Sequence, residues 1–274
     1  MGCAMRTDGR ARLAAAGFCC ADIYQNLHTW YPTGNGIDWG IHLSRMGYAV
    51  SAISVVGCDD YGNGMLEALK SEGLDISHLR REQGDTCITR MELRNGTDRV
   101  HLNSVDGVME HYRMTDEEIA FVGRHDLIHT DLFGRCLEHL PVWRDMGAET
   151  LVDFSVYSAD PDYRCREIFP YVDYVFFSAD GFTGDLRAWM QEISGYGPKL
   201  VTATMGTEGS LTCNEQEFYF CPAVPAEKLV NTVGAGDSYI AGFTDGLLRG
   251  LPIRECMEAG ARLASRVVGC FRPY

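Results

Sequence analysis

Four consecutive residues, Gly234-Ala235-Gly236-Asp237, combine the residue types that phosphate chemistry needs. They directly precede a helical pattern. Small residues there would leave the first backbone N–H groups of the helix open to an oxyanion, whose charge the helix dipole favours. We expect the same N–H groups to hold the Asp237 carboxylate ionised. An ionised carboxylate beside an anion hole suits phosphoryl transfer, in which it accepts the proton of an attacking hydroxyl.

The helix predicted after this stretch runs from Asp237 to Arg249, and Gly250 and Pro252 mark its end. Its apolar residues form one stripe, which consists of Tyr239, Ile240, Phe243, Leu247 and Leu248. The alternative interpretation is that Asp237 only caps this helix. The local residues alone leave both interpretations open.

Other nucleotide and hydrolase motifs are missing from the sequence. It has no G-x-x-x-x-G-K-[ST] phosphate loop, no G-x-G-x-x-G after a predicted strand and no G-x-S-x-G nucleophile turn. His125 and His129 are four residues apart, but the predicted strand Asp126–Thr130 begins between them, so they would not share a face as on a helix. We therefore predict no metal site made by protein side chains.

Short apolar runs alternate with helical patterns along most of the chain. The predicted strands are Ala14–Ala21, Ala49–Val56, Asp126–Thr130, Glu149–Phe154, Asp173–Ser178 and Lys199–Thr204. The predicted helices are Ile37–Met46, Asn63–Glu72, Thr115–Val122, Arg135–Met146, Asp185–Ile193, Asp237–Arg249 and Ile253–Val268. This alternation is typical of an α/β fold with a mostly parallel sheet and helices on both faces.

One segment departs from the alternation and predicts a β-hairpin. Thr86–Leu93 and Asp98–Asn103 flank Arg94-Asn95-Gly96-Thr97, and Asn-Gly between two strands is a strong hairpin signal. Such an insertion suits a lid over a site or a contact between subunits. We therefore predict one core domain with a small β insertion.

Composition and charge narrow the classes of partner. The chain has 274 residues and a formal net charge of −14, which argues against nucleic acid and against a polybasic membrane contact. No apolar run is long enough for a membrane span. The 11 cysteines show no pairing or metal pattern, which favours a reducing, cytoplasmic compartment. Residues 1–12 are predicted to be a disordered tail.

Several motifs in order resemble the ribokinase-like (PfkB-type) sugar kinases, whose C-terminal signature is D-T-x-G-A-G-D. Gly34-Asn35 and the helix after it match the family's G-G-N-x-x-N segment. Residues 56–62 match its V-G-x-D-x-x-G turn, and residues 204–210 match its T-x-G-x-x-G nucleotide segment. The resemblance covers nearly the whole chain. It implies a three-layer αβα sandwich over residues 13–274, with a β lid built mainly from about 22–33 and 86–104.

The resemblance also implies roles for individual residues. Asp237 would be the catalytic base, and Gly234, Ala235 and Gly236 would form the anion hole. Thr204, Gly206 and Gly209 would line ATP, and Asp22, Gly34 and Asn35 would hold sugar hydroxyls. Charge alone suggests that Arg90 or Arg99, on the lid, meets a substrate carboxylate. ATP and Mg²⁺ would be required.

The sequence departs from the family pattern at several positions. Asn231 replaces the first signature Asp, near the place where family members often bind K⁺, so dependence on a monovalent cation is in doubt. Asp38 replaces the later Asn of G-G-N-x-x-N; it would pair with a cationic substrate amine or serve neighbouring polar groups. The family's N-x-x-E, which helps to place Mg²⁺, has no clean match, and Asp180 is the nearest substitute.

Further short matches indicate the members of this family that act on a sugar–amine conjugate. They are found at 21–24, 73–78, 98–100, 107–109 and 153–155. They imply phosphorylation of the 6-hydroxyl of fructoselysine or a similar fructosamine. The alternatives are a kinase for another sugar or nucleoside, and a non-catalytic sugar or nucleotide sensor on the same scaffold. Lid strands in this family can pair two chains, which implies a homodimer as one expected assembly.

Overall fold

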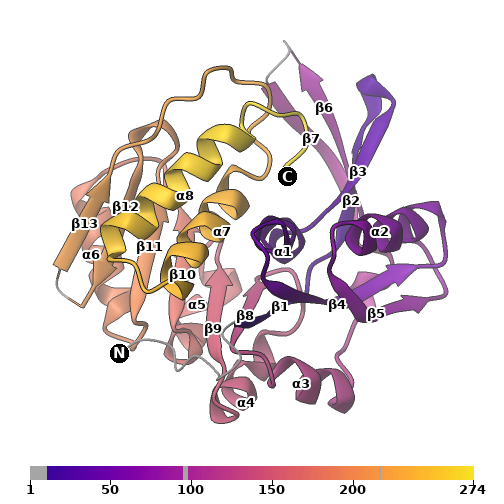
Figure 1. Ribbon diagram of the computed structural model, residues 1–274, viewed down its shortest axis with the longest axis horizontal. Helices are drawn as coiled ribbons and strands as arrows, with labels where there is room; N and C mark the ends of the chain where they lie inside the picture. Colours follow the sequence, from indigo (N-terminus) through magenta and orange to yellow (C-terminus); the bar gives the residue numbers. More distant parts are fainter. Residues whose placement is uncertain (1–10, 95–97, 216) are drawn as a thin grey trace.

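The computed structural model describes residues 11–94, 98–215 and 217–274. In this part of the chain nine strands form one large sheet, in the order β13-β12-β11-β10-β9-β8-β1-β4-β5 (Figure 1). Their bounds are β1 (Arg12–Ala16), β4 (Ala49–Gly57), β5 (Asp75–Glu82), β8 (Leu127–Asp131), β9 (Glu149–Asp153), β10 (Tyr174–Ser178), β11 (Leu200–Thr204), β12 (Ser210–Asn214) and β13 (Glu217–Cys221). Neighbours from β5 to β11 are parallel, and β12 and β13 add an antiparallel edge.

Helices cover both faces of the large sheet (Figure 1). Their bounds are α1 (Asn35–Arg45), α2 (Asp60–Ser71), α3 (Asp116–Val122), α4 (Leu140–Asp145), α5 (Cys165–Ile168), α6 (Gly184–Ser194), α7 (Ala235–Leu248) and α8 (Ile253–Val267). Within the described residues, no helix is long and apolar enough to cross a membrane.

The strands bury alternate residues in two separate cores, as a sheet covered on both faces requires. Leu13 and Ala15 of β1 pack in the core under α1, α2, α7 and α8. Ala14 and Ala16 pack in the opposite core, under α3, α4, α5 and α6. These layers confirm the predicted α/β sandwich with a mostly parallel sheet.

Helix starts are set by local polar residues. The Thr115 hydroxyl accepts a hydrogen bond from the Glu118 N–H, and Glu118 accepts one from the Thr115 N–H, so α3 begins with a capping box. Asp59 caps α2 by accepting from Gly62 and also accepts from the Thr86 N–H at 2.8 Å. The turn before α2 is thereby tied to the segment that enters the strand β6 (Ile88–Arg94).

A second sheet of four strands stands above α1 and α2 in Figure 1, and we call it the small sheet. Its order is β3-β2-β6-β7, with β2 (Cys20–Tyr24), β3 (Thr29–Thr33), β6 (Ile88–Arg94) and β7 (Asp98–Val105). Strands β6 and β7 pair antiparallel, and β2 joins them by pairing parallel with β6. The predicted Asn95-Gly96 turn lies outside the described residues.

The single strand predicted over Ala14–Ala21 is wrong. Strand β1 ends at Ala16, and Cys20 and Ala21 already belong to β2 of the small sheet. The chain turns at Gly17, whose φ is 124° and whose Cβ, if it had one, would lie 2.8 Å from the Cα of Gly134. The sequence does not indicate this change of sheet, because both strands are buried and the residues between them are uncharged.

Two other boundaries differ from the predictions. The tail predicted over residues 1–12 is wrong at its end: Ala11 is buried and Arg12 begins β1, where its N–H donates to Asp126. Residues 1–10 lie outside the described residues. The helix predicted over Arg135–Met146 is shortened to a 3-10 turn and α4, because Arg135 adopts a positive φ of 54°.

Candidate active site

Four parallel strands end on a polar residue at one edge of the large sheet. Asp131, Asp153, Ser178 and Thr204 are the last residues of β8, β9, β10 and β11. Asp131 pairs in register with Asp153, and Ser178 pairs with Thr204. The strand order reverses beside β1, and ligands of open α/β sheets bind at the carboxyl ends of strands near such a point.

Helix α7 begins with a turn that leaves backbone N–H groups exposed. Gly234 adopts a left-handed conformation (φ 73°), and a Cβ there would lie 2.4 Å from Pro273. The Ala235 N–H donates to Thr232 O at 3.3 Å, whereas the Gly236 N–H has no protein acceptor among the described residues. A Cβ on Gly236 would meet nothing within 4 Å. The turn therefore opens at Gly236, and we call residues 234–237 the anion hole.

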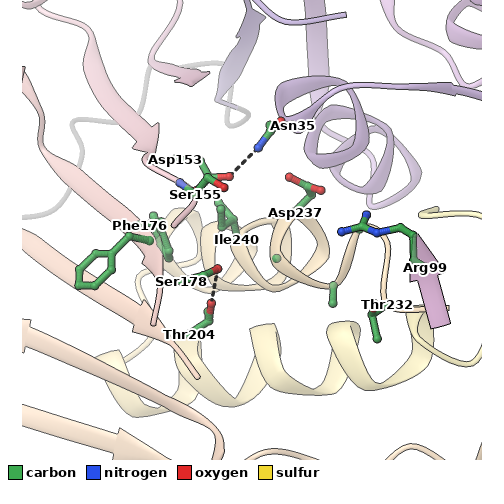
Figure 2. Close-up of a pocket in the computed structure, with 14 residues that line it drawn as sticks. Asn35, Arg99, Asp153, Ser155, Phe176, Ser178, Thr204, Thr232, Asp237 and Ile240 are labelled. Carbon is green, nitrogen blue, oxygen red and sulfur yellow. Dashed lines mark hydrogen bonds between the residues drawn. The ribbon is translucent and has the colours of Figure 1, made fainter. Parts of the chain in front are cut away.

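A cavity of about 200 Å³ joins the strand ends to the anion hole. Its polar lining includes Asn35 from α1, Arg99 from β7, Asp153 and Asp237. In Figure 2 the guanidinium of Arg99 points towards Asp237 from the side of the small sheet. The cavity thus brings an open helix start, a carboxylate and a cation to one place.

The start of α1 supplies an amide to this cavity. Asn35 Nδ2 donates to Asp153 Oδ2 at 2.7 Å (Figure 2). Asp153 Oδ1 accepts from the Ser155 N–H at 2.8 Å. These bonds fix the direction of the Asn35 side chain. Gly34 precedes α1 with φ 150°, and a Cβ there would lie 2.3 Å from Phe18 O. Only glycine allows this approach, so Gly34 contributes backbone alone.

The helix start was expected to hold Asp237 ionised by lowering the pKa of its carboxyl, but the shift runs in the opposite direction. Burial raises the pKa of the Asp237 carboxyl well above its ordinary value, and the nearby Asp153 and Asp131 raise it further. The Asp237 backbone N–H and Arg99 oppose this rise without cancelling it. The lowering effect of the helix start on this pKa is outweighed, because Asp237 is buried close to the carboxyl groups of Asp131 and Asp153. A raised pKa brings the group closer to the range in which a general base works best.

Asp22 and Asp38 lie at the base of the small sheet, and neither lines the cavity. Burial raises the pKa of Asp22 to about 7, and the positive charge of Arg99 opposes this rise, as it opposes the rise at Asp237. Asp38 is 1% exposed and accepts from the Thr33 hydroxyl at 2.6 Å. Its position favours the expectation that it serves neighbouring polar groups over a salt bridge to a substrate amine.

The remaining predicted residues separate into those that line the cavity and those that do not. Thr204 lines it, whereas Gly206, Gly209 and the exposed Asp180 do not. A Cβ on Gly209 would lie 2.2 Å from Cys221 O, so this glycine allows a close approach to the end of β13.

The two lid arginines border different cavities. Arg99 lines the cavity with Asp237, whereas Arg90 lines one of about 670 Å³ together with Trp30 and Tyr61. The sequence left open which arginine serves the site, and the cavity linings favour Arg99.

Sequence reasoning missed Asp153, Ser155, Ser178 and Thr232 as cavity residues. Two of them carried a usable signal, because Asp153 and Ser178 lie at or next to the end of a predicted parallel strand. The side chains that gather at one edge of such a sheet come from strand ends, whatever their sequence separation. Thr232 carried no such signal, since its position depends on how the loop before α7 folds.

The Asn231 side chain brings no charge that a monovalent cation would balance. Asn231 is uncharged and 1% exposed. Its Nδ2 donates to Tyr24 Oη (2.9 Å) and Phe271 O (3.0 Å), and its Oδ1 accepts from Val233 N–H. For a divalent metal, the described residues hold no group of three or more His, Cys, Asp or Glu side chains arranged as ligands. The cavity is lined by oxygen atoms, including those of Asp153, and therefore fits a divalent ion that binds together with a phosphate ligand.

Comparison with known proteins adds independent findings. Residues 29–273 match the sequence model described as pfkB family carbohydrate kinase. A fructoselysine 6-kinase of Shigella flexneri is 31% identical over 93% of this chain and 97% of its own. A fructosamine kinase of Bacillus subtilis is 30% identical over 96% of this chain and 93% of its own. The structure of Arabidopsis thaliana ribokinase complexed with ribose and ATP superimposes with a TM-score of 0.79 at 15% identity, covering 96% of this chain and 94% of the other.

Proposed function

Because this chain belongs to the pfkB family of carbohydrate kinases, we propose that it phosphorylates the 6-hydroxyl of fructoselysine or a similar fructosamine. The family makes the protein a phosphotransferase that moves a phosphoryl group from ATP to an alcohol of a small sugar substrate. The observation that carries the narrower proposal is the 31% identity to a fructoselysine 6-kinase over nearly the full length of both chains.

The reaction needs one proton acceptor, and Asp237 is the proposed group. It lines the cavity at the first turn of α7, and its raised pKa suits a base that must take up a proton. The acceptor O6 loses its proton to Asp237 and forms a bond to the γ-phosphorus. The bond between that phosphorus and the β–γ bridging oxygen breaks, which leaves ADP.

The charge on the moving phosphoryl group needs donors that are already in place. The open N–H of Gly236 and the dipole of α7 supply them at the anion hole. Asn35, held by Asp153, would orient a sugar hydroxyl beside Asp237. Mg²⁺ bound with ATP would supply positive charge between the phosphates, close to the crowded carboxyl groups of the cavity.

A substrate panel tests the proposed acceptor. With Mg-ATP and ADP detection, kcat/KM for fructoselysine should exceed that for fructose and for adenosine by about tenfold or more, the discrimination that a few polar contacts supply. The Asp237→Asn protein, assayed in parallel, reports contaminating kinase activity. A plain hexose or a nucleoside that reacts well while fructoselysine does not would exclude the fructosamine assignment and leave the family unchanged.

Arg99 is proposed to act at the reacting end of the substrate, because it lines the same cavity as Asp237 and its guanidinium points towards that carboxyl (Figure 2). Arg99→Ala should therefore lower kcat/KM on fructoselysine and on fructose alike, by about 10- to 100-fold, as for loss of a charged hydrogen-bond donor. Arg90→Ala, at the other cavity of the small sheet, is the matched control and should change activity little. A loss confined to fructoselysine would assign Arg99 to the amino-acid carboxylate instead.

A further inference from the structure

The last four residues of the chain, 271–274, lie against the base of the small sheet, and we call them the strap (Figure 1). Tyr274 Oη donates to Pro32 O of β3 at 2.8 Å. Pro273 O accepts from the buried His42 Nε2 of α1 at 3.0 Å. The backbone of Pro273 also fills the space beside Gly234, where a Cβ has no room. The strap thus contacts the small sheet, α1 and the anion hole.

An aromatic cluster continues this contact. The Phe271 ring packs 5.0 Å from Tyr24 of β2 and 5.9 Å from Tyr31 of β3, measured between ring centroids. Val233, next to the anion hole, belongs to the same buried cluster as Tyr24 and Tyr31. The small sheet, the strap and the loop before α7 therefore share one core, and a shift of one part moves the others.

Asn231 is the only residue of this junction, among those described, whose one side chain bonds to all three parts. Its Nδ2 donates to Tyr24 Oη of the small sheet and to Phe271 O of the strap. Its Oδ1 accepts from the N–H of Val233, directly before the anion hole. Its own backbone N–H donates to Val268 O, just after α8. Both N–H donors of this buried amide and one acceptor position of its oxygen are therefore occupied within the protein.

An amide suits position 231 better than a carboxylate, because two of its partners are oxygen atoms that accept a hydrogen bond from it. A carbonyl such as Phe271 O can only accept, and the Tyr24 hydroxyl oxygen also accepts a hydrogen bond from the Tyr31 hydroxyl at 3.2 Å. An aspartate at 231 would place a charged oxygen against Phe271 O, and a cation would then be needed between them. The –NH₂ group of asparagine meets both oxygens without any added charge.

We propose that Asn231 is a positioning residue that fastens the small sheet and the strap to the anion hole, and that its neutral amide makes this junction independent of a monovalent cation. This inference rests on the proposed phosphoryl transfer, because it concerns how the same anion hole is held. It goes beyond that proposal by naming a residue that touches neither ATP nor sugar.

The first test compares potassium chloride with tetramethylammonium chloride at equal ionic strength. Wild-type turnover should agree in the two salts within roughly twofold, since no charge at residue 231 calls for an ion. Asn231→Asp should lose activity in tetramethylammonium on the order of 10- to 100-fold, the effect of one or two lost buried hydrogen bonds. Potassium should restore part of this loss in the variant, which a merely weakened fold would not show. A wild-type enzyme that needs potassium overturns the inference.

A second pair of variants keeps the test informative if Asn231→Asp does not fold. Tyr24→Phe removes the hydroxyl that Asn231 contacts and should lower kcat/KM on the order of fivefold to tenfold, as for one buried hydrogen bond. Tyr31→Phe removes a hydroxyl of the same cluster that Asn231 does not contact, and it should have a smaller effect. Equal effects of the two variants overturn the positioning role.

Calorimetric affinity for a non-hydrolysable ATP analogue gives a readout that needs no sugar. It should be the same in both salts for the wild type and weaker in tetramethylammonium for Asn231→Asp. If no sugar is phosphorylated but these affinities hold, the proposed acceptor fails and the role of Asn231 stands. If turnover is observed but the wild-type affinity depends on potassium, the role of Asn231 fails alone.

Discussion

Replacing Asp237 by asparagine is expected to lower kcat by about 10²–10⁴-fold, the range for loss of a positioned general base. Asparagine keeps the shape of the side chain, but it cannot take the proton of the attacking hydroxyl. The anion hole stays in place because it consists of backbone, so ATP should still bind. Steady-state kinetics together with calorimetric binding of an ATP analogue measures both parts of this result.

The pH profile separates a base from a helix cap. Because the pKa of Asp237 is raised, the acid limb of wild-type kcat/KM should fall at a higher pH than an ordinary aspartate would give. Asp131, Asp153 and Asp237 interact, so the limb reports the group rather than one residue. In Asp237→Asn the residual activity should lack this limb. Near-wild-type turnover in the variant, or an unchanged acid limb, would assign Asp237 to capping alone.

Stability should not fall in the same variant. The raised pKa means that ionising Asp237 opposes folding. This cost to folding is absent below the unfolded-state pKa of about 3.9. It grows as the pH rises from that value towards the raised folded-state pKa, and it is complete above the folded-state pKa. Asparagine carries no charge, so the melting temperature of the variant at alkaline pH should equal or exceed that of the wild type. A clear decrease would mean that the loss of activity includes a loss of fold.

The sequence predicts the repeating part of the fold well because its signals are local. Strands such as Ala49–Gly57 and Glu149–Asp153 are buried on both faces and therefore appear as continuous apolar runs. Such runs fail where the chain changes sheets. At Gly17 a buried strand of the large sheet leads within a few residues into a buried strand of the small sheet, and hydrophobicity does not change between them. The turn at Gly17, with its φ of 124° and its close approach to Gly134, separates the two strands.

The candidate site was predictable where one segment holds both the geometry and the chemistry. Residues 234–237 satisfy this condition, because the helix start and its carboxylate are adjacent in sequence. The choice between Arg90 and Arg99 could not be made from the sequence, because both lie on neighbouring strands of the small sheet. The packing of that sheet decides which cavity each arginine borders. The direction of the pKa shift of Asp237 was likewise mispredicted, because Asp131 and Asp153 reach it from separate strands.

Placing a methyl group at Gly236 is expected to stop catalysis while leaving the fold intact. A Cβ at this position meets nothing within 4 Å, and Gly236 lines the cavity. The space it would fill is the one that a phosphoryl oxygen needs in order to reach the open N–H at the start of α7. Gly236→Ala should therefore lower kcat by about 10²–10³-fold, the effect of removing one oxyanion donor. Alanine also favours a helix, so the melting temperature should be unchanged or slightly higher.

Gly234→Ala is the matched control, because it adds the same methyl group two residues earlier with the opposite outcome. Gly234 has a positive φ of 73°, and its Cβ would lie 2.4 Å from Pro273 of the strap. This variant should lose stability by about 1–3 kcal/mol, from backbone strain and overpacking, and its activity should fall together with its folded fraction. Thermal unfolding and kcat measured on both proteins separate the two effects. If Gly236→Ala retains wild-type turnover, the phosphoryl group does not use this helix start; if it unfolds instead, the cavity is not open at Gly236.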